Sequence, residues 1–66
     1  MKVLVNGEPA DLADDETVHG IVIALGRGHR GIAVAVNGEV VPRSRWEATR
    51  LRDDDRVEVL TAAQGG

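Results

Sequence analysis

Apolar and polar residues alternate in short runs along this chain, and the first run, residues 2–5, ends in Asn6-Gly7. Alternation with a period of two is typical of a β-strand that buries one face. Asn-Gly favours a two-residue hairpin turn, because both central residues of such a turn need positive φ. We therefore predict a β-hairpin that returns through residues 8–12, where Pro9 marks an edge strand because it has no N–H to donate.

The same pattern returns in the second half of the chain. Residues 32–36 alternate and lead into Asn37-Gly38, and residues 39–41 follow as a second returning strand. A last alternating run, residues 57–60, comes after an acidic turn. These runs predict a second hairpin and a final strand.

Between the two hairpins the apolar period changes from two residues to that of a helix. Thr17 is a suitable N-cap, preceded by acids that favour the positive end of a helix dipole, and Gly26 is a suitable C-cap. Gly20 and several β-branched residues lower the helix propensity of this segment. The apolar spacing nevertheless predicts a helix over residues 18–25, with its apolar side formed by Val18, Ile21, Val22 and Leu25.

Residues 43–48 predict a short irregular or helical turn in which Trp46 closes one end of the core, and residues 49–51 predict a brief edge strand. The order of the elements predicts an α+β domain, a mixed four- to five-stranded sheet with one helix packed across one face. A hairpin, a crossover helix and a second hairpin allow the first and last strands to lie parallel at the centre of the sheet. The folded domain is assigned to residues 1–61 and a free tail to residues 62–66.

Alternation along each strand assigns side chains to the two faces of this sheet. The residues expected to face the helix are Met1, Val3, Val5, Val34, Val36, Val57 and Val59. Those expected on the opposite face are Leu4, Ala33, Ala35, Glu58 and Leu60. This second face is too apolar for a solvated surface and has no covering element, so we predict that it is a docking surface for a protein partner.

Composition excludes several classes of function. The 66 residues contain no cysteine, which excludes disulfides, thiolate metal sites and cysteine nucleophiles. A net charge of −3 and a single aromatic residue, Trp46, argue against nucleic acid as a partner. No apolar run has the length of a secretory segment or a membrane span. The sequence therefore predicts a cytoplasmic protein that does not bind membranes. We also expect the isolated domain to be a monomer.

No group of residues predicts catalysis or metal binding. The two histidines, His19 and His29, have no carboxylate or second histidine at ligand spacing, and nothing in the sequence marks a base for Ser44. The acidic run 53–55 lacks the alternating ligands of a calcium loop and predicts a solvated turn. Turn geometry alone explains the Asn-Gly pairs. We predict that the chain is not an enzyme, holds no metal and binds no cofactor.

The sequence ends on Gly65-Gly66. Residues without a Cβ can pass through a narrow channel and adopt backbone angles closed to other residues. Such an ending suits a carboxylate that enters the active site of another protein as a substrate. It also suits an inert frayed tail, and the two glycines alone do not separate these interpretations.

The chain resembles the thiamine-biosynthesis sulfur-carrier proteins, a family of small ubiquitin-like β-grasp domains. The resemblance covers essentially the whole length, and the valine–proline–arginine block before Trp46 together with the final glycines is its most specific part. The matching segments are residues 1–3 with Asn6-Gly7, 16–19, 35–38, 40–43 with Trp46, 53–59 and Gly65-Gly66. Two residues depart from the family pattern. Gly20 suggests a softer helix, and Gln64 stands where the family often has a small or apolar residue.

The resemblance implies a carrier on which other proteins act. A partner adenylating enzyme would transfer AMP from ATP to the Gly66 carboxylate, with ATP and Mg²⁺ bound by that enzyme. A sulfide equivalent from a protein persulfide would displace AMP and leave a thiocarboxylate, whose sulfur thiazole synthase would take to build the thiazole ring of thiamine. Gly65 would give access. We also predict that the partners contact Ala62, Ala63 and Gln64, together with the uncovered face of the sheet that the alternation of the strands indicates.

Three alternatives remain open at the level of sequence. The chain also resembles, more distantly, the small subunit of molybdopterin synthase, which would make molybdopterin the destination of the sulfur. A ubiquitin-like protein modifier would use the same terminus for conjugation to lysines. A plain interaction domain would leave the glycine tail inert.

Overall fold

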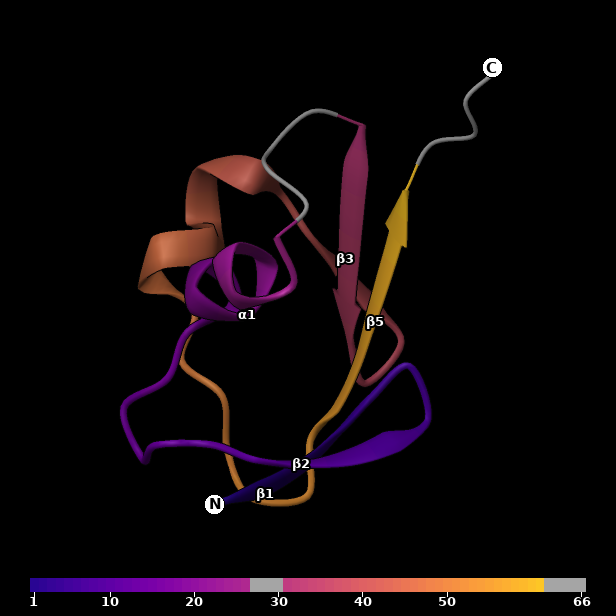
Figure 1. The fold of residues 1–66 in the computed structure, drawn as a ribbon. Helices are drawn as coiled ribbons and strands as arrows, with labels where there is room; N and C mark the ends of the chain where they lie inside the picture. The colour runs from indigo at the N-terminus through magenta and orange to yellow at the C-terminus, as the bar shows by residue number, and fades with distance from the viewer. Residues whose placement is uncertain (27–30, 62–66) are drawn as a thin grey trace.

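The computed structural model describes residues 1–26 and 31–61, and within these residues it shows a five-stranded sheet crossed on one face by one α-helix (Figure 1). The elements in chain order are β1 (Lys2–Val5), β2 (Glu8–Asp11), α1 (Val18–Ala24), β3 (Ile32–Val36), β4 (Glu39–Val41), the 3₁₀ helix η1 (Arg43–Ala48) and β5 (Arg56–Thr61). The predicted α+β class, with a mixed sheet and a helix on one face, is confirmed. The tail assigned to residues 62–66 lies outside the described residues.

The last strand occupies the middle of the sheet. The strand order is β2-β1-β5-β3-β4, and β5 pairs parallel with β1 and antiparallel with β3. The outer pairs β1–β2 and β3–β4 are antiparallel hairpins. The predicted parallel pairing of the first and last strands is therefore confirmed, and β5 runs from the acidic turn directly towards the end of the chain (Figure 1).

Both hairpins turn at the predicted Asn-Gly pairs. Asn6 and Gly7 have φ of 52° and 83°, and Asn37 and Gly38 have φ of 52° and 85°. Positive φ at both central residues is required by the two-residue turn whose twist matches that of the flanking strands. Turn geometry is nevertheless an incomplete explanation of the two asparagines. Their side-chain amides also form hydrogen bonds with the backbone of β5, which corrects the prediction from sequence.

The helix begins where the capping signals place it. Thr17 has extended backbone angles, and its hydroxyl accepts a hydrogen bond from the N–H of Gly20 at 3.2 Å. The carboxylate of Glu16 accepts from the N–H of Thr17 at 2.9 Å. The helix ends at Ala24 with Leu25 as its C-cap, one position before the predicted cap, and Gly26 follows with a φ of 71°.

The edge strand predicted for residues 49–51 is wrong. Arg50 forms only an isolated bridge with Thr17, in which the N–H of Val18 donates to Thr49 and the N–H of Leu51 donates to Glu16. The pairing cannot extend, because the chain becomes helical after Thr17 and its N–H groups turn along the helix axis.

The core lies between the sheet and α1, with η1 at its end. The buried residues are Val3, Val18, Ile21, Val22, Val34, Trp46, Leu51, Val57 and Val59. Of the side chains predicted to face the helix, four are in this set, and Met1, Val5 and Val36 are partly buried against it. The predicted assignment of faces is confirmed, as is the position of Trp46 on a short helical turn that closes the core.

Among the helices of the described segments, none has the length and apolar character needed to cross a membrane.

Candidate functional site: the open face of the sheet

The face of the sheet opposite α1 carries the side chains predicted from alternation. The register places Ala33 beside Leu60 and Ala35 beside Glu58 on neighbouring strands β3 and β5. Leu4 extends the row on β1. Leu4 and Leu60 are 38% and 64% exposed, and they belong to a row of apolar side chains on neighbouring strands, which is more informative than a single exposed leucine. We call the row formed by Leu4, Ala33, Ala35, Glu58 and Leu60 the open face.

The open face extends further than the sequence interpretation placed it. Val40 on β4 lies beside Ala35 and is 75% exposed, and Pro9 on β2 lies beside Leu4. A two-residue turn fixes the register of each hairpin, so counting outward from Asn37-Gly38 would have placed Val40 on this face.

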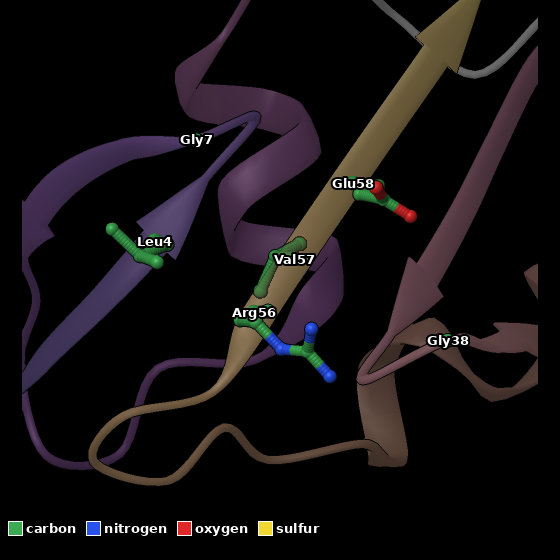
Figure 2. Close-up of a pocket in the computed structure, with 6 residues that line it drawn as sticks. All are labelled: Leu4, Gly7, Gly38, Arg56, Val57 and Glu58. Atoms are coloured by element: carbon green, nitrogen blue, oxygen red, sulfur yellow. The ribbon is translucent and has the colours of Figure 1, made fainter.

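The open face is hollowed between β1 and the first half of β5 (Figure 2). The hollow measures about 210 Å³ and is lined by Leu4, Gly7, Gly38, Arg56, Val57 and Glu58. In Figure 2 the Leu4 side chain extends from β1, and Arg56 and Glu58 extend from β5 with α1 behind the sheet. Pockets that enclose small molecules usually measure about 300–1,000 Å³. An apolar anchor flanked by a cation and an anion in a small hollow suits a side chain of a protein partner.

Leu4 has a central place on this face. It lines the hollow beside β5 and also a second hollow with Lys2, Val3, Pro9 and Asp54. A partner that covers either hollow therefore contacts Leu4. The side chain stands between a lysine on its own strand and Arg56 on the next, with Asp54 nearby, so the apolar centre has a charged rim.

The last strand of the open face, β5, is followed in the sequence by Gly65 and Gly66, the residues predicted to react. Thr61, the last residue of β5, pairs with Ile32 at the end of β3. Ala62, Ala63, Gln64, Gly65 and Gly66 follow, and these predicted site residues lie outside the described residues. The strand that forms the middle of the open face is thus the strand that carries the tail.

A third hollow lies between the start of α1 and η1, and the sequence did not predict the group of residues that lines it. His19, Arg43, Ser44, Trp46 and Glu47 line a common hollow, so the fold brings the carboxylate of Glu47 and the hydroxyl of Ser44, both far away in the sequence, towards His19. His19 Nε2 lies 3.9 Å from Glu47 Oε2, which is longer than the hydrogen bond that orients a catalytic base. Glu47 is largely exposed, and an exposed pair of this kind contributes little to stability.

The acidic residues 53–55 form the turn before β5, and two of them accept hydrogen bonds from backbone N–H groups. Asp53 accepts from the N–H of Lys2 at 2.8 Å, and Asp55 accepts from the N–H of Arg52 at 2.8 Å. Asp54 has a φ of 71°. Within residues 1–26 and 31–61, no group of three or more histidine, cysteine or acidic residues has the arrangement of a metal site.

Comparison with known proteins identifies the family to which this arrangement belongs. The model of the ThiS family matches residues 3–66 of the chain. The chain belongs to the ThiS family. The family predicted from the sequence motifs is therefore confirmed.

Relatives of full length and a solved structure agree with this assignment. The sulfur carrier protein ThiS of Escherichia coli is 30% identical over 66 residues, which cover 100% of both chains. The crystal structure of the thiamine biosynthesis protein ThiS from Geobacter metallireducens superposes with a TM-score of 0.82 at 35% identity, covering 100% of both chains. The structural match confirms the β-grasp fold of this ThiS family member.

A longer relative contains a ThiS-like part. The thiazole synthase of Magnetococcus marinus is 36% identical over 66 residues, and the chain spans 20% of the length of that protein. In that bacterium, a ThiS-like sequence is thus part of a protein named for thiazole synthesis.

Proposed function

We propose that this chain is a sulfur carrier in thiamine biosynthesis, and that Gly66 is the residue that carries the sulfur. The main support is the match of the ThiS family over residues 3–66, which reaches the terminal glycines. The Escherichia coli sulfur carrier aligns over its whole length with this chain. The carrier acts as a co-substrate, and the catalytic groups belong to its partners.

The chemistry explains why a carrier needs an activating partner. A carboxylate is a poor acyl donor, because its leaving group would be oxide. Transfer of AMP from ATP to the Gly66 carboxylate releases pyrophosphate and provides a good leaving group. The outer sulfur of a protein persulfide then attacks the acyl carbon and expels AMP, and reduction of the resulting disulfide by a thiol leaves the thiocarboxylate.

The acceptor of the sulfur is proposed to be thiazole synthase. A ThiS-like sequence within a protein named thiazole synthase supports this partner, because two parts of one polypeptide meet at high effective concentration. The Geobacter metallireducens structure is named for thiamine biosynthesis and the Magnetococcus marinus relative for thiazole synthesis, which favours this destination over molybdopterin. Conjugation to lysines has no support of this kind.

The fold suits delivery of a tail into a buried site. Five or six extended residues reach about 17–20 Å, so the tail can enter a partner's active site while the folded domain remains outside. The open face provides a surface for the adenylating enzyme, with Leu4 and Leu60 as apolar contacts exposed by 38% and 64%. Glycine at the last two positions leaves room for the reacting carboxyl group.

Intact-mass spectrometry tests the proposed function. The chain is incubated with its cognate adenylating enzyme, ATP and Mg²⁺, and then with a persulfide donor and a thiol. We expect an acyl-adenylate in the first step and, in the second, a mass increase equal to the exchange of one oxygen for sulfur. Deletion of Gly66, or addition of one residue after it, should abolish both products without altering the far-UV circular dichroism. Failure of the unmodified chain to form any acyl-adenylate would refute the proposed function.

A further inference from the structure

The side chain of Asn6 binds the backbone of β5 near the end of the described chain. The N–H of Val59 donates to Asn6 Oδ1 at 2.8 Å, and Asn6 Nδ2 donates to the carbonyl of Val59 at 3.2 Å. The two bonds join residues that are far apart in the sequence. Together they satisfy both the backbone N–H and the backbone carbonyl of Val59. Both bonds are part-buried and Val59 is only 6% exposed, so leaving its backbone groups unpaired would carry a cost in free energy.

The amide group takes the place that a further strand residue would occupy. The parallel pairing of β1 with β5 ends at Val5 beside Val57, and the N–H of Asn6 donates to the carbonyl of Val57 at 2.8 Å. The backbone then turns away, because Asn6 has a φ of 52°. The backbone of β1 therefore forms no pairing with β5 beyond Val57, and on this edge of β5 the Asn6 side chain provides the hydrogen bonds to Val59.

We propose that Asn6 is a positioning residue for the reactive tail, an inference that rests on the proposed function. Its side chain extends the ladder to Val59 and so fixes the last part of β5 on both sides. Residues 62–66 follow Thr61, the last residue of this strand, in the sequence. A fixed exit direction increases the fraction of docked carriers whose terminal carboxylate enters the partner's active site, and small misplacements of a reacting group reduce rates strongly.

Asn37 provides a matched control within the same chain. It is also the first residue of an Asn-Gly turn, with the same φ of 52°. Its Oδ1 accepts from the N–H of Arg56 at 2.9 Å and its Nδ2 donates to Asp55 at 2.9 Å. Asn37 therefore holds the start of β5, whereas Asn6 holds the part that leads into the tail.

The test compares Asn6→Gly with Asn37→Gly, because glycine keeps the positive φ of the turn and removes only the side chain. Acyl-adenylate formation is measured with the cognate adenylating enzyme at a temperature where circular dichroism shows each variant folded. For Asn6→Gly we expect kcat to fall about tenfold, with KM for the carrier within about twofold of the original value. For Asn37→Gly both constants should stay within about twofold. If Asn6→Gly keeps its kcat, or if both variants lose it equally, the proposal is wrong.

A second variant and a second measurement cover the remaining outcomes. Asn6→Asp keeps the turn and the bond from the Val59 N–H but places an oxygen opposite the Val59 carbonyl, so kcat should again fall if Asn6→Gly does not fold. Amide hydrogen exchange at Val59 should be about tenfold faster in a folded Asn6 variant than in Asn37→Gly. This measurement needs no enzyme. If the unmodified chain forms no acyl-adenylate, the proposed function fails, and unchanged exchange at Val59 would separately overturn the role of Asn6.

Discussion

The indole N–H of Trp46 donates a hydrogen bond to the carbonyl of Val41 at 2.9 Å. Trp46 lies on η1 and Val41 ends the edge strand β4, so this bond ties the 3₁₀ helix to the sheet across Pro42. The indole ring itself is 2% exposed and packs in the core with residues of α1 and the sheet. One side chain therefore joins the sheet, α1 and η1.

Replacement of Trp46 should be the most destabilising change in the chain. Trp46→Ala creates a cavity at a cost of about 3–5 kcal/mol, and a chain of 66 residues has a total stability of about 3–10 kcal/mol. Trp46→Phe keeps most of the ring burial but loses the bond to Val41, for about 1–3 kcal/mol. Urea denaturation followed by far-UV circular dichroism measures both. Equal stabilities of the two variants would contradict the role assigned to ring burial.

Gly20→Ala should stabilise the helix by less than glycine replacement normally does. Alanine gains about 1 kcal/mol over glycine in a helix interior, but a Cβ at this position would meet the carboxylate of Glu16. That carboxylate accepts from the N–H of Thr17 at 2.9 Å, and its displacement offsets part of the gain. In a Glu16→Ala background the full gain should return, so a double-mutant cycle measures the coupling. An identical gain in both backgrounds would show that Glu16 moves aside at no cost.

The elements that the sequence predicts correctly depend on local chemistry. Asn6-Gly7 specifies a tight hairpin by itself, and Thr17 caps a helix through atoms of its own turn. The strand faces follow from alternation once the sheet has a covered side. Such features need no knowledge of what lies beside them in space.

The features that the sequence did not predict depend on pairs distant along the chain. The bonds from Asn6 to Val59 exist only because β5 lies parallel to β1, and no pattern near Asn6 contains that fact. His19 and Glu47 meet because η1 lies against α1. Residues 49–51 have the composition of a strand, but the helix cap at Thr17 ends their only pairing. Tertiary placement decided each of these cases.

Leu60→Glu should weaken adenylation by interfering with docking. Leu60 is 64% exposed on the open face, so its replacement should leave the fold stable. If the adenylating enzyme covers this face, loss of an apolar contact and burial of a charge should raise KM for the carrier about tenfold or more. Ile23→Glu is the control, since Ile23 is 50% exposed on α1, on the other side of the sheet, and should change KM by less than about twofold. Unchanged adenylation by Leu60→Glu would remove the open face from the docking surface.

Val40 and Glu39 test how far the docking surface extends towards the edge of the sheet. The two residues are adjacent on β4 but point to opposite faces, because Val40 lies beside Ala35 and Glu39 beside Val36. Val40→Gln removes exposed apolar surface without adding charge, and it should raise KM for the carrier about three- to tenfold if the partner covers β4. Glu39→Gln introduces the same side chain at the neighbouring position on the other face and should leave KM unchanged. Steady-state adenylation assays on both variants decide the point: an effect of Leu60→Glu without any effect of Val40→Gln would confine the partner to β1, β5 and β3.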